Sequence, residues 1–131
     1  GHSLGSLTAQ MLAARYPDRV DKIVLVSSSL RPGGALGSWL WDNVMPLVAP
    51  IDPNGQFMMD WYWNPNPVDA DYIDRERVES AATPMHVWHG VLWDLAVTDL
   101  APIATQIKAP VLILWGDQDQ LFDATHQSAL K

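Results

Sequence analysis

The amino-acid sequence predicts an α/β fold in which parallel strands carry flanking helices and a mainly helical segment is inserted between them. Two unbroken apolar runs, residues 23–26 and 111–115, have the aliphatic and β-branched composition of parallel strands buried on both faces. A helical pattern over residues 4–15 precedes the first run. The long segment 31–107 between the runs shows helical periodicity that prolines interrupt.

The chain opens on Gly1-His2-Ser3-Leu4-Gly5, a G-x-S-x-G pattern. This pattern places a serine on a sharp turn between a strand and a helix. The turn holds the serine in a strained backbone conformation, and we expect a side chain at Gly1 or at Gly5 to collide with its neighbours. At average Gly and Ser usage, roughly 4 % of chains of this length carry the pattern by chance. The residues that follow must therefore support it.

A helix and a strand follow the motif in the order that such a turn requires. The helix is expected over residues 4–15 and ends before Pro17, because a proline disfavours helical geometry in the residue before it. Its apolar stripe has the i, i+3, i+4, i+7, i+8 spacing and consists of Leu4, Leu7, Thr8, Met11 and Leu12. The apolar run at 23–26 then predicts a buried strand.

These segments together resemble the α/β-hydrolase family, through the motif at 1–5, Ala-Arg-Tyr-Pro-Asp-Arg-Val at 14–20 and Ile-Val-Leu-Val at 23–26. The resemblance implies that Ser3 is a nucleophile. It also implies that the backbone N–H of Leu4 donates to the oxyanion of the reaction, and that an acid and then a histidine follow along the chain. The competing interpretation is a Gly/Ser loop before an ordinary helix.

The family commonly inserts a helical cap between the strand after the nucleophile helix and the acid-bearing strand. We expect this cap over residues 31–107, which leaves 1–30 and 108–131 as a partial α/β-hydrolase core. Helical spacing predicts a helix through Leu36, Leu40, Val44 and Leu47, a polar helix over 71–82, and a helix through Trp88, Val91, Leu92 and Leu95 after Thr83-Pro84.

The expected cap is rich in tryptophan and methionine, which suits an apolar pocket. The candidate pocket residues are Trp39, Met58, Trp61 and Trp88. The alternative is that these side chains build the core of the cap itself. For any single residue the core of the cap is the favoured interpretation, but collectively some of these side chains should face the cleft.

The second apolar run ends abruptly at Gly-Asp-Gln-Asp over residues 116–119. Functional residues of open α/β sheets lie just beyond the carboxyl ends of the strands. In the family that the sequence resembles, the acid of the catalytic triad comes three residues after this glycine, which carries the role onto Asp119. Asp117 is the alternative acid, and we expect it instead to cap the turn through its side chain.

The histidine base of the family has no match among the histidines near the motifs. His2 occupies the variable position of the serine motif, and we expect its ring to lie near the sheet. His126 lies in the first turn of a helix that Asp123 caps, expected from residue 124 onward. It follows Asp119 too soon to be the base of the family.

The composition limits the partners. His86 and His89 lie on one face of a predicted helix, but no cysteine or suitably spaced carboxylate completes a metal site, so neither a metal nor another cofactor is expected. A net charge of −7 without a Lys/Arg cluster argues against nucleic acid and anionic membranes as partners. No apolar run approaches the ~18 residues of a membrane span. The sequence carries no signal for an oligomeric state.

The resemblance implies a serine hydrolase that cleaves a carboxylic ester or a related acyl bond of a small, apolar or aromatic acyl compound through an acyl-enzyme. Alternatives on the same fold are carbon–carbon bond hydrolysis, perhydrolase or haloperoxidase-like chemistry, and acyl transfer. A non-catalytic binding protein is the alternative of another class. Because the motif stands at residue 1 and a helix has just begun at Lys131, we expect an internal segment of a longer hydrolase that shows no esterase turnover by itself.

Overall fold

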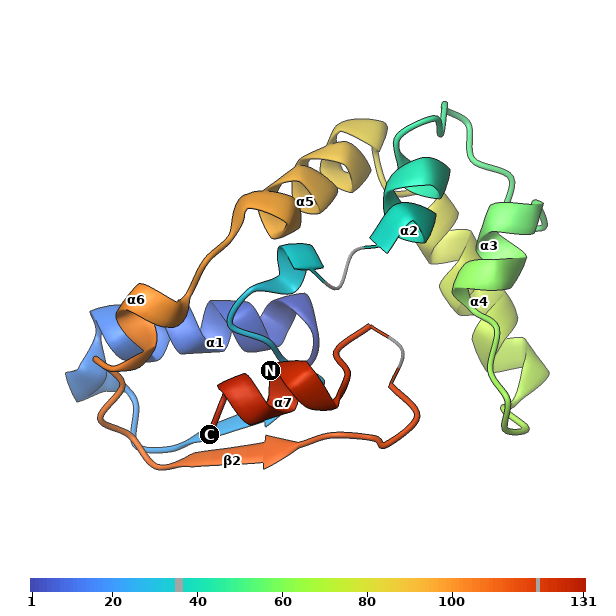
Figure 1. The fold of residues 1–131 in the computed structure, drawn as a ribbon. Helices are drawn as coiled ribbons and strands as arrows, with labels where there is room; N and C mark the ends of the chain where they lie inside the picture. The colour runs from blue at the N-terminus through green and yellow to red at the C-terminus, as the bar shows by residue number, and fades with distance from the viewer. Residues whose placement is uncertain (35–36, 120) are drawn as a thin grey trace. The chain divides into compact units, whose positions relative to one another are not determined.

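The computed structural model describes three stretches of the chain, residues 1–34, 37–119 and 121–131. They form two compact units, which can be followed by colour in Figure 1. Unit 1 combines residues 1–37 with residues 94–131, and unit 2 consists of residues 38–93.

Unit 1 contains a parallel sheet. Strands β1 (Ile23–Val26) and β2 (Val111–Leu114) pair in parallel and in full register. The residues of the serine motif add a third parallel segment to β1. The amino group of Gly1 donates to the Val24 carbonyl (2.8 Å), and the Val26 N–H donates to the Gly1 carbonyl (2.9 Å). The serine motif is therefore anchored to the backbone of β1.

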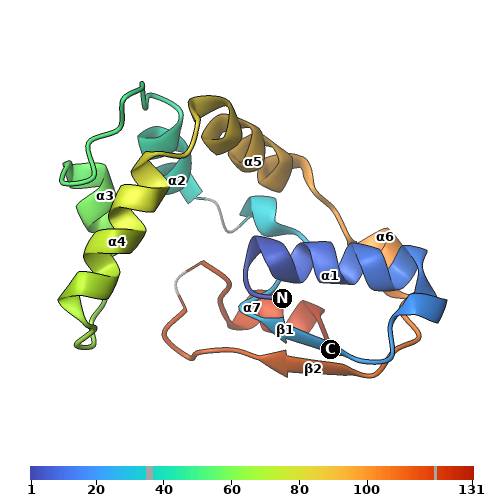
Figure 2. The same cartoon turned by 180° about the vertical axis from the view of Figure 1, so that it is seen from behind.

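Helix α1 (Leu4–Arg15) begins at the serine turn and covers one face of this sheet, as Figure 2 shows. Its bounds are those that the sequence predicts. Ala13 joins Ile23 and Leu25 of β1 in a buried core, and partly buried side chains pack around them: Ala9, Val20, Ile107 and Ala109. The short 3-10 helix η1 (Pro17–Arg19) then leads into β1.

The predicted apolar stripe of α1 is confirmed at Leu7 and wrong at Leu4, Thr8 and Leu12. Leu4 and Leu12 are 42 % and 50 % exposed, and the buried side chains of the helix are Ser6, Leu7, Gln10, Ala13 and Ala14. The small serine and alanine side chains let the helix approach the sheet closely. The buried polar side chains find hydrogen-bond partners there, which a pattern of hydrophobicity does not register.

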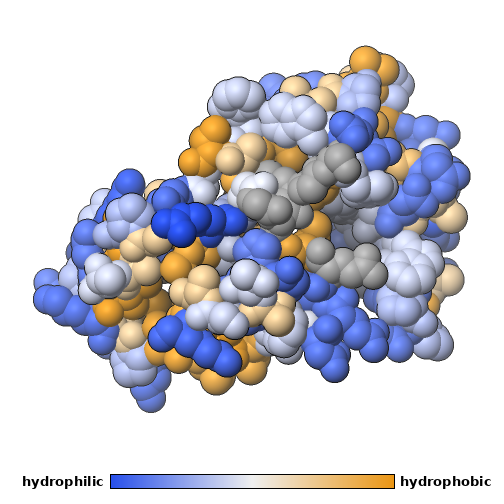
Figure 3. Space-filling model, in the orientation of Figure 1, coloured by the Kyte–Doolittle hydropathy of each residue, from blue (hydrophilic) through white to orange (hydrophobic). Residues whose placement is uncertain are grey.

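The expectation that both faces of the strands are buried is also wrong for the described chain. Helices α1, α6 (Ala101–Ala104) and α7 (Ala124–Ala129) all lie on one side of the strands in Figures 1 and 2. On the other side Val24 is 42 % and Leu112 is 54 % exposed. Figure 3 accordingly shows apolar side chains at the surface along β2. Both apolar runs form strands, but the described residues cover only one face of the sheet that these strands form.

Two segments of unit 1, at residues 30–31 and 99–101, contact each other through a hydrogen bond and an ion pair. The Leu100 N–H donates to the Leu30 carbonyl (2.8 Å), and the Arg31 guanidinium lies 3.0 Å from the Asp99 carboxylate. A hydrogen bond from the Ala101 N–H and the neighbouring Arg31 hold the pKa of Asp99 below its usual value. The 3-10 helix η2 (Pro32–Gly34) follows the first segment.

Unit 2 is helical throughout its regular structure in the part that is described. The helices that lie wholly or mostly in unit 2 are α2 (Gly37–Val44), α3 (Gln56–Trp61), α4 (Ala70–Ala81) and α5 (Met85–Val97). The helices predicted through Leu40 and Val44, over 71–82 and after Thr83-Pro84 are therefore present, while Leu36 lies outside the described residues. Leu40, Val44, Met58 and Leu92 form the buried apolar positions of the unit.

Unit 2 falls inside the segment 31–107 that the sequence predicts as an inserted cap. The inserted cap and its limits at 31 and 107 stay a prediction. Among the described residues, no helix combines the length and the apolar character that crossing a bilayer demands.

Candidate active site

Ser3 lies at the turn between the anchored segment and α1, in a backbone conformation that L-residues rarely adopt. Its φ is 49° and its ψ is −123°. Such a conformation costs about 1 to 3 kcal/mol and persists only where its surroundings enforce it. Here the Ser3 N–H donates to the Val26 carbonyl (3.0 Å) and the Gly5 N–H donates to the His2 carbonyl (2.8 Å). The predicted strained turn is present at this serine.

The two glycines of the motif differ in the space that surrounds their Cα atoms. A Cβ at Gly1 would lie 2.1 Å from the carbonyl oxygen of Gly5 and 2.7 Å from the nitrogen of Ser6. A Cβ at Gly5 would meet nothing within 4 Å outside its own helix turn. The expected collision is therefore confirmed at Gly1 and wrong at Gly5, among the residues that the structure describes.

We expect Gly1→Ala and Gly5→Ala to change stability in opposite directions. The alanine at position 1 would collide with backbone, so its cost should reach about 3 kcal/mol, the upper end of the range for overpacking. The alanine at position 5 should add about 0.5 to 1 kcal/mol, because alanine is the better helix former. Urea unfolding of both variants, in a protein that contains this chain, measures the difference. Equal destabilisation by the two variants would contradict it.

The first N–H of α1 is free in the described structure. The amides of Gly5, Ser6 and Leu7 donate to the carbonyls of His2 and Ser3, whereas no acceptor is present for the Leu4 N–H among the described residues. This N–H follows directly on Ser3, at the positive end of the helix dipole. Such a group is available to a negatively charged oxygen beside the serine.

A layer of buried polar side chains lies behind the turn and was missed by the sequence-based prediction. Ser6 and Ser28 are 0 % exposed, and Gln10 and Ser29 are nearly as buried. The Ser6 and Ser28 hydroxyls are 2.6 Å apart, and the Gln10 amide donates to Ser28 Oγ (3.0 Å) and to the Ser29 carbonyl (3.1 Å). The available signal was the Ser-Ser-Ser run directly after the apolar strand.

This polar layer also reaches the loop that follows β2. Gln127 of α7 is buried, and its amide donates to the Ser28 carbonyl and to the Phe122 carbonyl, at 3.1 Å in both cases. The Phe122 N–H in turn donates to Asp119 Oδ1 (2.9 Å). Backbone and side-chain hydrogen bonds therefore connect the serine turn with the predicted acid.

Asp119 is half-buried and fixed by its own loop. Its N–H donates to the Gly116 carbonyl (3.0 Å), and its Oδ1 accepts from the N–H groups of Leu121 and Phe122, both at 2.9 Å. Within the described residues Oδ2 has no donor. One carboxylate oxygen is thus held by backbone while the other is open to an external donor.

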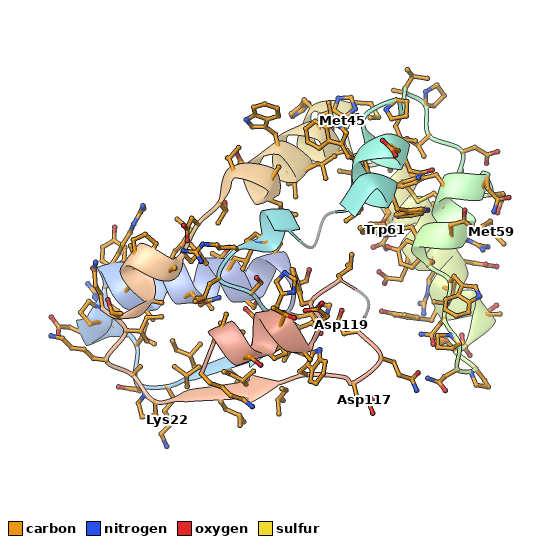
Figure 4. All side chains as sticks on the ribbon, viewed as in Figure 1. Lys22, Met45, Met59, Trp61, Asp117 and Asp119 are labelled. Atoms are coloured by element: carbon orange, nitrogen blue, oxygen red, sulfur yellow. The ribbon has the colours of Figure 1, made fainter. Side chains whose placement is uncertain are left out.

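The structure gives the turn-capping role to Asp119, whereas the sequence-based prediction gave it to Asp117. Asp117 is exposed and points outward from the loop in Figure 4, while Asp119 lies beside the start of α7. The difference arises because the amides that turn toward a carboxylate belong to residues 121 and 122, which lie within reach of Asp119.

The histidines near the turn have local partners. His2 is exposed and forms a parallel bridge with Val26. His126 lies 2.9 Å from the carboxylate of Asp123, which caps α7 as the sequence predicts. The hydrogen bond from His126 and the helix amides hold the pKa of Asp123 below its usual value.

The other two histidines lie in unit 2, where the His89 ring is 3.2 Å from the Val44 carbonyl. His86, three residues earlier, is exposed on the same helix. In the described part of the chain no three His, Cys, Asp or Glu side chains come together as metal ligands.

Three of the four predicted pocket residues, the tryptophans, belong to one aromatic cluster inside unit 2. Trp39 stacks on Trp61 with ring centroids 6.5 Å apart, and Trp88 meets Trp61 edge-on at 5.7 Å. Phe57 contacts all three tryptophans. Met58 has no exposed surface, and Trp39 and Trp61 are partly exposed. Their role in binding a substrate stays a prediction.

A parallel sheet with a serine at positive φ on its strand-to-helix turn is the arrangement of the α/β-hydrolase class. The chain belongs to the alpha/beta hydrolase fold family, whose family model matches residues 1–131. The α/β fold with a partial hydrolase core and a helical region, predicted from the sequence, is thereby confirmed.

Similar proteins include several hydrolases. Lipase 1 of Psychrobacter immobilis is 28 % identical, and the match covers 92 % of this chain and 40 % of the lipase. The 3-oxoadipate enol-lactonase 2 of Acinetobacter baylyi is 24 % identical, with 91 % of this chain and 45 % of the lactonase covered. The 2-hydroxy-6-oxo-6-phenylhexa-2,4-dienoate hydrolase of Burkholderia cepacia is 24 % identical, with 96 % and 47 % covered.

The chain thus spans less than half the length of these relatives. No solved structure matches it significantly.

Proposed function

We propose that a protein containing this chain is a serine hydrolase that cleaves a carboxylic ester or a related acyl bond, with Ser3 as the nucleophile. The observation that carries the proposal is the strained backbone of Ser3 at the strand-to-helix turn, next to the free N–H of Leu4. Backbone strain of this kind clusters at active sites, ligand clamps and switch regions. The membership of the family and the hydrolases among its relatives support the same reaction class.

In the proposed reaction Ser3 Oγ attacks the acyl carbonyl carbon while a histidine base takes its proton. The Leu4 N–H donates to the oxyanion that forms. The intermediate collapses when the base returns the proton to the leaving alcohol, which gives the acyl-enzyme. Water, activated by the same base, then releases the acid and restores Ser3. We assign this base to none of the four histidines of the chain.

Asp119 is the proposed triad acid. Its Oδ1 is held by the Leu121 and Phe122 amides, which leaves Oδ2 to accept the Nδ1–H of the base. A carboxylate in this position fixes the tautomer of the histidine and stabilises the imidazolium that forms. The mechanism uses no cofactor.

The proposed substrate is a small compound with an apolar or aromatic acyl group. The partly exposed rings of Trp39 and Trp61, backed by Trp88, support an aromatic binding surface in a cap over residues 31–107. Hydrolysis of a carbon–carbon bond is the second candidate function. It is favoured by the similarity to the dienoate hydrolase, a protein 24 % identical to this chain.

Covalent trapping tests the proposal. A fluorophosphonate, which reacts with activated serines, should modify one residue in the tryptic peptide that ends at Arg15, and mass spectrometry should place the adduct on Ser3. Aryl esters of increasing acyl length and a dienone compound, assayed on the same preparation, separate ester from carbon–carbon hydrolysis. Turnover without an adduct at Ser3 would refute Ser3 as the nucleophile. If the protein shows neither turnover nor an adduct, a binding protein is favoured.

A further inference from the structure

We infer that Gln127 is a positioning residue, which holds Phe122 of the acid loop at the end of β1 and thereby fixes Asp119 relative to Ser3. The acid loop is the described part of the segment between β2 and α7, residues 115–119 and 121–123. The inference rests on the proposed function, in which Ser3 is the nucleophile and Asp119 the triad acid. Gln127 acts through the backbone of the loop, since among the described residues its amide donates to neither of these two side chains.

The orientation of the Gln127 amide follows from its partners. Its nitrogen lies 3.1 Å from the Ser28 carbonyl oxygen and 3.1 Å from the Phe122 carbonyl oxygen. Carbonyl oxygens only accept, and an amide nitrogen carries two protons, so each carbonyl receives one of them. The reversed amide would place its own oxygen against two others. Gln127 therefore uses its full donor capacity to bridge two backbone segments, and Ser28 lies 99 residues away along the chain.

On one side the bridge leads to the proposed acid. The Phe122 carbonyl accepts from Gln127, and the Phe122 N–H donates to Asp119 Oδ1 at 2.9 Å. Phe122 is thus held at its carbonyl by α7 and holds the carboxylate with its N–H. Figure 4 shows Asp119 beside the start of α7, the helix that carries Gln127. A shift of Phe122 would therefore be passed on to the carboxylate.

On the other side the bridge leads to the proposed nucleophile. Ser28 follows β1 by two residues, and the carbonyl of Val26, the last residue of β1, accepts the Ser3 N–H at 3.0 Å. The backbone that Gln127 contacts at Ser28 is therefore the continuation of the strand that anchors the serine turn. The bridge joins the two proposed catalytic residues through a short run of backbone on each side.

No parallel connection exists among the described residues. The ladder between the strands ends where the Ser27 N–H donates to the Leu114 carbonyl (3.0 Å). Beyond Leu114 the hydrogen bonds of the described residues join the loop and α7 to themselves, and the bond from Gln127 to Ser28 is the exception. The acid loop is therefore held at its start by the ladder and at its end by Gln127.

Burial sets this bridge apart from a surface contact. Gln127 is 5 % exposed, and both acceptors belong to buried residues, Ser28 and Phe122. Gln127 is also the only buried side chain of α7 within the described residues. Apolar packing does not account for a glutamine here, because its Oε1 is buried and accepts from no group of the described protein, which costs stability. Its contribution to the fold consists of the two donated hydrogen bonds.

The test compares Gln127→Met with Gln10→Met in an active protein that contains this chain. Methionine has nearly the length of glutamine but no donor. Gln10 is 2 % exposed, and its amide also donates twice, to Ser28 Oγ at 3.0 Å and to the Ser29 carbonyl at 3.1 Å. These hydrogen bonds start from α1 and do not reach the acid loop. Gln10→Met is therefore matched in substitution, in burial and in the number of hydrogen bonds lost.

We expect Gln127→Met to lower kcat about tenfold at nearly constant KM, which is less than the 10²-fold loss that a misplacement of about 1 Å can cause. The pKa of the histidine base, read from the acid limb of the pH profile of kcat/KM, should fall, because a carboxylate that is held less firmly stabilises the imidazolium less. Gln10→Met should lower the melting temperature to a similar extent but leave kcat and the pH profile unchanged. All values are taken per active site titrated with the fluorophosphonate, so a smaller folded fraction does not imitate the effect.

A double-mutant cycle with Asp119→Asn separates positioning of the acid from a general structural role. If Gln127 acts through Asp119, Gln127→Met should change kcat by less than about twofold once the carboxylate is gone, because residues that act as a unit are not additive. Gln127→Leu removes the same two donors with a side chain of another shape, so the result does not depend on how well one replacement packs.

The inference is overturned if Gln127→Met and Gln127→Leu match Gln10→Met in kcat and in the pH profile. It is also overturned if their loss of kcat is equally large in the Asp119→Asn protein. The proposed function fails separately, if Ser3 takes up no fluorophosphonate or if Asp119→Asn keeps full turnover.

Discussion

Replacing Ser3 by alanine is expected to lower kcat by a factor on the order of 10⁶ in an active protein that contains this chain. The alanine removes the atom that attacks the acyl carbon, and no other serine shares its position on the turn. KM should change little, because Ser3 Oγ contributes chiefly to the transition state and to the acyl-enzyme. Hydrolysis of an aryl ester, followed spectrophotometrically at saturating substrate, measures the loss.

Ser27 offers a matched control for this experiment. It is half-buried like Ser3, it follows the neighbouring strand, and its φ of 47° nearly equals the 49° of Ser3. Ser27→Ala places an alanine under the same backbone strain, and we expect kcat per titrated active site to stay within about twofold of the unchanged protein, because the Ser27 hydroxyl takes no part in the proposed reaction. A Ser3→Ala protein that keeps its turnover would remove Ser3 from the mechanism.

Local patterns predicted the elements that hold Ser3. The spacing of apolar residues and Pro17 gave α1 its bounds at Leu4 and Arg15, and the unbroken apolar run gave β1. Both signals lie within a few residues of the element that they describe. The strained turn at Ser3 followed from the same short stretch, because the G-x-S-x-G pattern itself describes a local geometry.

The environment of α1 was not predictable in the same way. Gln10 is buried because Ser28 and Ser29 accept from its amide, and these partners lie 18 and 19 residues away along the chain. A hydrophobic pattern counts such a residue as exposed, and it counts Leu12 as buried, although half of Leu12 is exposed. Pairing between distant polar residues decides which face of this helix is buried.

The sequence also did not predict which aspartate caps the loop after β2, although the residues involved lie close together along the chain. The sequence places Asp117 and Asp119 two residues apart in one turn, and turn preferences fit either residue. The choice depends on where the Leu121 and Phe122 amides point, which is set by the burial of Phe122 and its contact with Gln127. Predicting which aspartate caps the turn therefore requires the direction of the backbone after the turn.

Asp119→Asn is expected to lower kcat about 10⁴-fold. The asparagine carbonyl oxygen can take the place of Oδ1 and accept the Leu121 and Phe122 amides at the present 2.9 Å. The amide nitrogen then replaces Oδ2, so a donor faces the histidine base where an acceptor is needed. The base is left in the wrong tautomer while the loop keeps its shape, and the melting temperature should change little.

Asp117→Asn is the matched control, since it makes the same substitution two residues away on an exposed side chain. We expect its kcat to stay within about twofold, because surface changes without a special contact have small effects. Steady-state kinetics and thermal melts of both variants decide between the two carboxylates. If Asp117→Asn is the inactive variant, the triad acid is Asp117 and the hydrogen bonds of Asp119 serve the loop alone. If both variants keep full turnover, the acid lies outside this turn, because a neutral amide at its position would leave the imidazolium without a countercharge.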